Sequence, residues 1–99
     1  MKIHFGTMTG EQFLSRLRAE GFPPPADITR DAGDALDDHA HAFEAWGLVT
    51  EGEFFIEVEG VVSRFPAGHS FRLPPGTPHR EWAGPQGARY LAGRKERVA

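Results

Sequence analysis

Apolar and polar positions alternate most clearly over residues 53–59. Phe54, Ile56 and Val58 share one parity, and glutamates fill most of the positions between them. Because successive side chains of a β-strand point to opposite faces, this segment is predicted to be a strand with one buried face. Shorter apolar runs, separated by Gly and Pro, predict further strands. These lie near residues 27–32, 38–42, 45–51, 61–65, 70–73, 78–83 and 88–93, with a short edge strand within 1–7.

One helix is expected near the start of the chain, over about residues 9–20. Thr9 and Gln12 have the spacing of a capping box, in which each side chain bonds the backbone N–H of the other residue. Apolar residues within 13–17 form a narrow stripe, and Gly21 with the prolines after it ends the helix. A helix this short is expected to pack on the outside of a larger body.

The succession of short strands predicts an all-β fold, with a barrel of about eight or more strands formed by residues 26–93. The chain has 99 residues, which is enough for one domain and too few for two. We therefore expect a single domain over 1–99, with the short helix at its N-terminal side. The 12 Gly and 8 Pro agree with the frequent turns that such a fold needs.

Charge and cysteine content exclude several classes of function. The net charge is −3 and there is no broad basic stripe, so nucleic acid is not an expected partner. The chain has no cysteine, which excludes disulfides, thiolate metal sites and a cysteine nucleophile. No segment approaches the roughly 18 apolar residues of a membrane-spanning helix, and the start lacks the apolar stretch of a signal peptide. A cytoplasmic location without membrane contact is expected.

Three histidines form the pattern that carries chemistry. His39 and His41 are two residues apart, so in a strand their imidazoles point to the same face. Imidazole nitrogens bind divalent metals at about 2.0–2.2 Å, and a same-face pair can converge on one ion. A third ligand has to come from another strand. His79 follows the tight turn at 74–78, which determines where the next strand begins and where this side chain points.

The spacing of these residues resembles two motifs of the cupin superfamily. The first motif is Gly, five residues, His-x-His, three or four residues, Glu, six residues, Gly; the second is Gly, five residues, Pro-x-Gly, two residues, His, three residues, Asn. The matching residues are Gly33, His39, His41 and Gly52 in the first motif and Gly68, Pro74, Gly76 and His79 in the second. The resemblance implies a double-stranded β-helix, or jelly-roll barrel, that frequently forms homodimers. It also implies one divalent ion (Fe, Mn, Ni or Zn) held by His39, His41 and His79.

Two positions depart from these motifs. Ala45 stands where the glutamate is expected, and Ala83 stands where the asparagine is expected. The neighbouring Glu44 has the wrong parity and faces away from the metal, unless a bulge at 42–44 turns it inward. We therefore expect that Glu44 does not bind the metal.

Glu81 shares its parity with His79, so its side chain is expected to face the barrel interior. There it could be a fourth metal ligand, an acceptor that orients a ligating histidine, or a base in the pocket. A solvated glutamate at the mouth of the barrel is the alternative. The sequence leaves these readings open.

Several residues outside the motifs carry weaker expectations. Trp46 and Leu48 have outward parity and need cover, which a helix or, most simply, a second subunit could supply. We therefore expect a homodimer. His69 follows a turn glycine and is expected to be exposed. Three arginines in strands are candidate anion contacts, with solvated strand faces as the alternative: Arg64, Arg72 and Arg80.

The predicted site limits the chemistry. Three neutral imidazoles leave a divalent ion its full charge, which favours a small, anionic, chelating substrate. Similarity to three-histidine cupins such as cysteine dioxygenase implies a mononuclear dioxygenase or a related lyase. A non-catalytic, sensor-like module that binds a small molecule is the alternative, because a fold does not determine a function. A metal-free isomerase of the sugar type is a third possibility, against which the histidine cluster argues.

Overall fold

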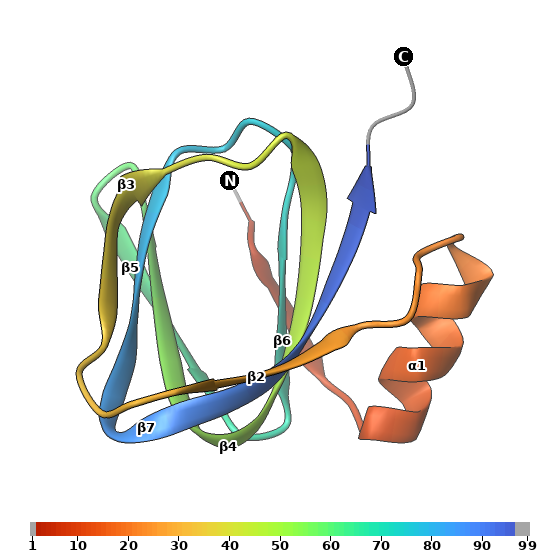
Figure 1. The fold of residues 1–99 in the computed structure, drawn as a ribbon, viewed down its shortest axis with the longest axis horizontal. Coiled ribbons are helices and arrows are strands. Elements are labelled where there is room, and N and C mark those ends of the chain that lie inside the picture. Colours follow the sequence, from red (N-terminus) through yellow and green to blue (C-terminus); the bar gives the residue numbers. More distant parts are fainter. Residues whose placement is uncertain (1, 97–99) are drawn as a thin grey trace.

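The strands wrap into an antiparallel barrel, and the one helix lies on its outside (Figure 1). The computed structural model describes residues 2–96. The elements, in chain order, are β1 (His4–Thr7), α1 (Gly10–Ala19), β2 (Ala26–Arg30), β3 (Ala35–His39), β4 (Phe43–Val58), β5 (Val61–Pro66), β6 (His69–Leu73) and β7 (His79–Glu96). The all-β jelly-roll fold with a short N-terminal helix is confirmed.

Two long strands, β4 and β7, each run through both sheets of the barrel. The first part of β4 pairs with β6 and with the last part of β7, within the order β1-β6-β4-β7-β2. The last part of β4 pairs with β5 and with the first part of β7, which in turn pairs with β3. Four expected strands have therefore merged into two, and residues 2–96 form seven strand elements instead of about eight or more.

The long strands change sheets at a corner where Gly52 meets Gly87. The register between β4 and β7 shifts twice here, between Val49 and Glu51 and between Gly52 and Phe54. Both glycines have left-handed backbones, with φ of 69° at Gly52 and 79° at Gly87. A Cβ on Gly52 would overlap the carbonyl oxygen of Gly87. Only glycine fits this corner, because a side chain would be strained and would also force the two strands apart.

The barrel interior holds the main hydrophobic core. The alternation that predicted a strand over 53–59 is confirmed, since Phe54, Ile56 and Val58 are buried inward-facing residues of β4. Aromatic rings from other strands pack beside them, with Phe54 4.7 Å from Tyr90 and 5.7 Å from Phe71 between ring centroids. The core therefore joins β4, β6 and β7 across the inside of the barrel.

The helix covers a second, outer hydrophobic cluster. The capping box is confirmed: Gln12 N donates to Thr9 Oγ1 at 3.1 Å, and Thr9 N donates to Gln12 Oε1 at 2.9 Å. Phe13 and Leu17 are fully buried against β4, where the Phe13 ring meets Trp46 edge-on at 5.7 Å. No helix in the described part of the chain is long and apolar enough to span a membrane.

This outer cluster answers the question of what covers β4. Trp46 and Leu48 are each only 2% exposed, because Phe13, Leu17 and Phe22 pack on them. The chain's own helix therefore supplies the cover that the sequence argument assigned to a second subunit. The premise that Trp46 and Leu48 need a second subunit as cover was therefore wrong, whereas the homodimer itself remains a prediction.

Substitution at the corner glycine should be costly for a specific reason. We expect Gly52→Ala to destabilise the protein by about 1–3 kcal/mol more than Gly60→Ala, because overpacking typically costs this much. Gly60 has a similar φ of 80° but open space around it, so its substitution adds backbone strain alone. Urea unfolding of the two variants measures the difference. Equal losses of stability would show that the contact with Gly87 is unimportant.

Candidate metal centre

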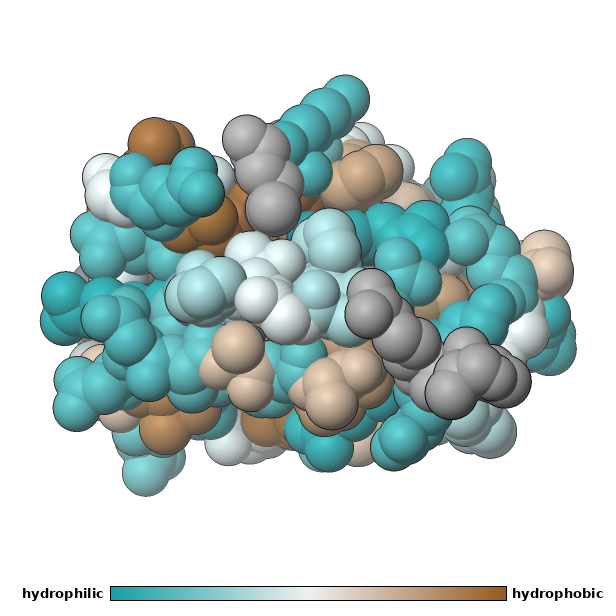
Figure 2. Space-filling view, turned by 90° about the horizontal axis from the view of Figure 1, so that it is seen from above, coloured by the Kyte–Doolittle hydropathy of each residue, from teal (hydrophilic) through white to brown (hydrophobic). Residues whose placement is uncertain are grey.

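The three histidines meet at one end of the barrel. In Figure 1 the connection between β3 and β4 and the turn between β6 and β7 both cross the upper end. The two segments are bonded to each other, since Gly76 N donates to the carbonyl of His41 at 2.8 Å. Seen from this end, the surface is mainly hydrophilic with apolar residues between (Figure 2). The Pro-rich turn thus brings His79 to the same place as the His-x-His segment.

The sequence placed the first two histidines in one strand, which is only partly right. The strand was predicted over 38–42, but β3 covers Ala35–His39 and the chain bends before β4 begins at Phe43. His41 therefore lies in the connection. It still points toward His39, with 4.8 Å between the ring centroids. The parity argument also holds beyond the bend, because Ala45 lines the interior cavity while Glu44 pairs outside it with Arg72 at 3.1 Å.

The structure brings four possible metal-binding groups together: His39, His41, His79 and Glu81. One donor atom from each lies within 4.8 Å of all the others. The ring centroids of His79 are 4.2 Å from His39 and 5.2 Å from His41. Three imidazoles and a carboxylate are a donor set that suits Fe, Mn, Ni or Zn.

Backbone carbonyls orient two of the imidazoles. His39 Nδ1 lies 2.7 Å from the carbonyl oxygen of Asp37, and His79 Nδ1 lies 2.9 Å from that of Thr77. A carbonyl oxygen can only accept, so each Nδ1 carries a proton and donates it. In a neutral ring the other nitrogen, Nε2, is then a bare lone pair, which is the form that binds a metal.

Glu81 faces both of these lone pairs. Its Oε1 lies 3.1 Å from Nε2 of His79 and 3.1 Å from Nε2 of His39. Nε2 of His39 is buried and makes no hydrogen bond among residues 2–96. Lone pairs facing a carboxylate need a positive charge between them, either a proton or a metal ion. Two donors that each lie about 2.1 Å from one ion, at right angles, are about 3.0 Å apart, so the spacing fits a metal.

The second oxygen of Glu81 is held by Arg30. Nη1 of Arg30 donates to Glu81 Oε2 at 3.0 Å and lies 3.3 Å from the hydroxyl of Tyr90. Nε of Arg30 donates to Asp34 Oδ2 at 2.9 Å. Glu81 is thus shared between an arginine on one side and two histidines on the other. The reading of a solvated glutamate at the barrel mouth is wrong, because Glu81 is only 8% exposed.

These contacts shift the pKa values of the site in opposite directions. Burial alone would lower the pKa of His79, but hydrogen bonds to Glu81 and Thr77 outweigh it and raise the pKa. Burial would raise the pKa of Glu81, but hydrogen bonds from His79 and Arg30 lower it. Burial lowers the pKa of His41, and the neighbouring His39 and His79 lower it further. Without a metal, His79 and Glu81 therefore form an ion pair.

A cavity of about 340 Å³ opens beside this cluster. Its other walls are mostly apolar and come from strands on both sides of the barrel, including Ile28, Phe54, Ile56 and Leu73. Sites for small molecules are typically concave and apolar with a few placed polar groups. The cluster supplies those groups here.

The arginines named from the sequence lie elsewhere. Arg72 pairs with Glu20 and stacks over Trp46, with 4.1 Å from its Cζ to the ring centroid. Arg64 pairs with Glu53, and Arg80 lies 3.7 Å from Glu57. The solvated-face alternative therefore describes Arg64 and Arg80, whose side chains are exposed, but not Arg72, whose side chain is only 19% exposed.

Several polar residues of the cavity were missed, Arg30 and Tyr90 among them. Arg30 and Tyr90 both line it, yet neither was singled out from the sequence. The signal was present, because Arg30 shares its parity with Ile28 in one strand and Tyr90 shares its parity with Ala88 and Ala92 in another. A charged residue in phase with buried apolar neighbours is an indication of a functional interior group.

The remaining histidines pair with each other, away from the site. His4 Nε2 lies 2.8 Å from His69 Nδ1, and the rings stack at 5.0 Å between β1 and β6. His69 is thus partly buried, where exposure was expected.

The ion pair should make the stability of the metal-free protein depend on pH. His79, with a pKa raised above 6.5, stabilises the fold below that pH, and this contribution is lost as the pH rises through its folded-state pKa. We expect the free energy of unfolding in a chelator to fall as the pH rises above about 6.5, and to fall less in Glu81→Gln. Urea unfolding measures this. Glu57→Gln, on the outer face beside Arg80, is the matched control and should behave like the wild type; an unchanged slope in Glu81→Gln would contradict the pairing.

Comparisons with known proteins agree with this architecture. The cupin domain family matches residues 27–92. An RmlC-like cupin from Shewanella frigidimarina is 32% identical, with a TM-score of 0.65 over 74% of this chain, which spans 65% of the length of that protein. KdgF from a Halomonas species is 26% identical, with a TM-score of 0.59 over 76% of this chain and 72% of that one. A search of curated proteins found no significant match.

A more distant likeness concerns the fold alone. Oxalate decarboxylase from Bacillus subtilis, studied for its Mn(II) centres, is 21% identical. The TM-score is 0.64, over 81% of this chain and 23% of that one. The match to the family model includes both motif segments and all four clustered side chains, and it shows that the chain belongs to the cupin domain family.

Proposed function

We propose that this chain is a mononuclear metal enzyme, a dioxygenase or lyase, that acts on a small, anionic, chelating substrate. His39, His41 and His79 hold one divalent ion, and Oε1 of Glu81 is the fourth donor. The observation that carries this proposal is the convergence of these four groups at a cavity of about 340 Å³. The buried Nε2 of His39 adds to it, because this nitrogen faces Glu81 at 3.1 Å without a hydrogen bond within residues 2–96, and such an atom is costly unless a ligand satisfies it.

Glu81 takes the place of the missing motif glutamate in this proposal. Ala45 has no donor atom, but it lines the same cavity, and Glu81 reaches the cluster from β7. With one carboxylate among the donors, the centre has a net charge of +1, lower than a centre of three histidines alone. Such an ion, when bound, polarises a chelating substrate and stabilises the negative charge that develops on it.

The protein's own residues supply orientation and exclude water. Carbonyls of Asp37 and Thr77 hold two imidazoles in the metal-binding tautomer. Arg30 holds Glu81 by its second oxygen, so the carboxylate keeps its direction whether or not a substrate is present. The apolar walls keep the rest of the substrate out of water, which strengthens every charge interaction at the site.

Metal binding should depend on His41 and be independent of Glu44. We expect His41→Ala to abolish stoichiometric binding of Mn(II), Fe(II), Ni(II) or Zn(II), and Glu81→Gln to weaken it about 10- to 100-fold. Glu44→Ala is the control on the neighbouring strand positions and should leave binding nearly unchanged, because Glu44 pairs with Arg72 outside the cavity. Elemental analysis after dialysis gives the metal content. Metal retained in His41→Ala, or lost in Glu44→Ala, would overturn the assignment.

Turnover separates the enzymatic classes. The Fe(II)-loaded protein should consume O₂ with a β-diketone or a thiol carboxylate if it is a dioxygenase, and should convert its substrate without O₂ if it is a lyase. An oxygen electrode and product analysis under nitrogen measure the two outcomes, with His41→Ala as the inactive control. Metal and ligand binding without turnover under either condition would instead identify a sensor-like binding module.

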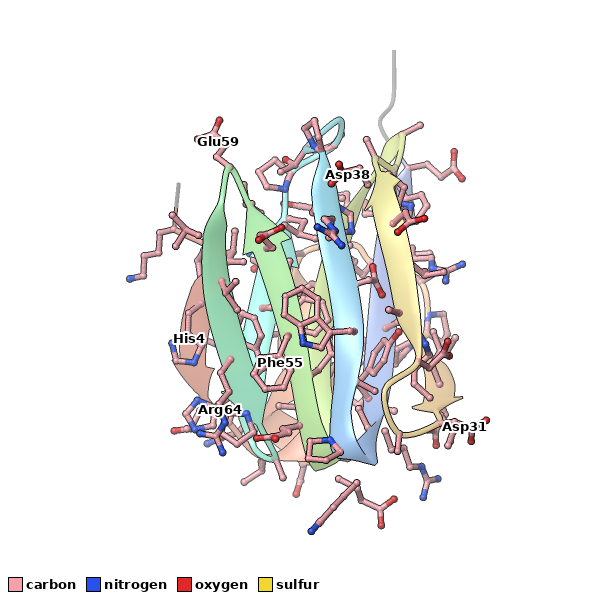
Figure 3. All side chains as sticks on the ribbon, turned by 90° about the vertical axis from the view of Figure 1, so that its left-hand side faces the viewer. His4, Asp31, Asp38, Phe55, Glu59 and Arg64 are labelled. Carbon is pink, nitrogen blue, oxygen red and sulfur yellow. The ribbon has the colours of Figure 1, made fainter. Side chains whose placement is uncertain are left out.

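The homodimer is proposed on different grounds from those in the sequence. Phe55 lies on the outer face of the barrel, where it stacks on Trp82 at 5.6 Å between centroids (Figure 3). Both rings are only partly buried within the chain, and Val62 nearby on β5 is 50% exposed. A partly exposed apolar group of this kind, on a face that also carries the Arg64–Glu53 and Arg80–Glu57 pairs, favours a two-fold contact. Light scattering at micromolar concentration should show a dimer, and a stable monomer would contradict the proposal.

A further inference from the structure

Arg30 has hydrogen-bonding capacity that the protein does not use. Its side chain is only 11% exposed inside the barrel, and two of its three nitrogens bond Asp34, Glu81 and Tyr90. The third nitrogen, Nη2, is buried and has no hydrogen-bond partner within residues 2–96. A buried guanidinium N–H without an acceptor is costly, so this nitrogen is suited to an acceptor that arrives with a ligand.

Tyr90 offers a second donor at the same place. Its hydroxyl oxygen accepts from Nη1 of Arg30 at 3.3 Å, which leaves the hydroxyl proton to be donated elsewhere. Burial raises the pKa of Tyr90, so the hydroxyl keeps this proton at neutral pH. Tyr90 lines the cavity together with Arg30. Two donors side by side are the arrangement that binds a carboxylate.

The charges around the cavity make anion binding depend on the metal. Arg30 and Arg94 line it with two positive charges, and Asp34 and Glu81 with two negative ones, so these four cancel, and a protonated His79 adds at most one positive charge in the absence of a metal. A divalent ion at neutral histidines changes the balance to +2. An anionic ligand is therefore favoured more strongly when the metal is bound, even though Arg30 is always charged.

We propose that Arg30 and Tyr90 form an anion subsite, and that the ligand of this protein has two anionic ends. One end chelates the metal at His39, His41 and His79, and the other is a carboxylate that accepts from Arg30 Nη2 and the Tyr90 hydroxyl. This inference rests on the proposed metal function, which it deepens by naming the substrate class. The ligand is accordingly a small dicarboxylate or oxo-dicarboxylate, with its short apolar middle against the cavity wall.

Glu81 lies between the two places where the ends of the ligand bind. Its Oε1 faces the histidines while its Oε2 accepts from Arg30, so the anion subsite and the metal lie on opposite sides of one carboxylate. The two ends of the ligand are therefore joined by a short chain that passes beside this carboxylate. Arg30 is in this account a specificity-determining residue.

Matched ligands test the subsite. The probes are 2-oxoglutarate and 2-oxopentanoate, which share the chelating end and chain length but differ in the distal carboxylate. With Mn(II)-loaded protein, calorimetry should show that 2-oxoglutarate binds about 10- to 100-fold more tightly, the range expected for hydrogen bonds to a charged group. In Arg30→Gln this preference should disappear while 2-oxopentanoate still binds. Tyr90→Phe, which keeps the ring in the core, should lose part of the preference.

The controls separate the possible failures. Arg80→Gln makes the same charge change on the outer face and should retain the full preference. Metal content is measured for every variant. If Arg30→Gln has lost its metal, the preference for 2-oxoglutarate in Tyr90→Phe tests the subsite instead. Wild-type protein that binds no metal would overturn the proposed function, and this inference with it. The subsite alone would be overturned if metal-loaded wild type showed no preference for 2-oxoglutarate. It would also be overturned if the preference were lost in Arg94→Gln and kept in Arg30→Gln and Tyr90→Phe.

Discussion

The pairing of β4 with β7 is the contact on which the rest of the structure depends. The two strands stay hydrogen-bonded from Phe43 opposite Glu96 to Glu57 opposite Arg80, although both change sheets on the way. The first part of β7 therefore carries His79 and Glu81 into one wall of the barrel, and the last part carries Tyr90 into another. A corner that only glycine can occupy permits this change of direction.

Within that frame, the site is organised by one shared carboxylate. Glu81 satisfies Arg30 with one oxygen and faces two histidines with the other. Buried charges are tolerated only when they are paired and hydrogen-bonded in this way, because an unpaired ion in an apolar interior is strongly unfavourable. Each member of the network consequently depends on the others. Loss of Glu81 would leave Nη1 of Arg30 with the Tyr90 hydroxyl as its one remaining acceptor within residues 2–96, and it would also remove the acceptor that faces His79.

Much of the site and fold could be predicted from local signals. The alternation over 53–59, the capping box at Thr9 and Gln12, and the His-x-His and Pro-rich turn segments are all properties of short stretches of chain. The inward direction of Glu81 followed from its spacing to His79, and the outward direction of Glu44 followed from its spacing to His41. These predictions succeeded because side-chain direction in a strand depends on parity, which needs no knowledge of the neighbouring strands.

Other features were decided by contacts between distant parts of the chain. Only packing shows that Phe13 and Leu17 cover Trp46, and a helix and a second subunit were equally compatible with the outward parity of that residue. Whether 45–51 and 53–59 form two strands or one depends on a continuous partner, which β7 supplies. Arg30 lies 51 residues before Glu81, and their ion pair exists only because β2 and β3 both pair with β7. The sequence by itself determined which residues face inward and which three histidines share one end of the barrel. The tertiary structure decided which partners each of these side chains contacts, because electrostatic pairing and burial depend on distances between strands, which parity alone does not give.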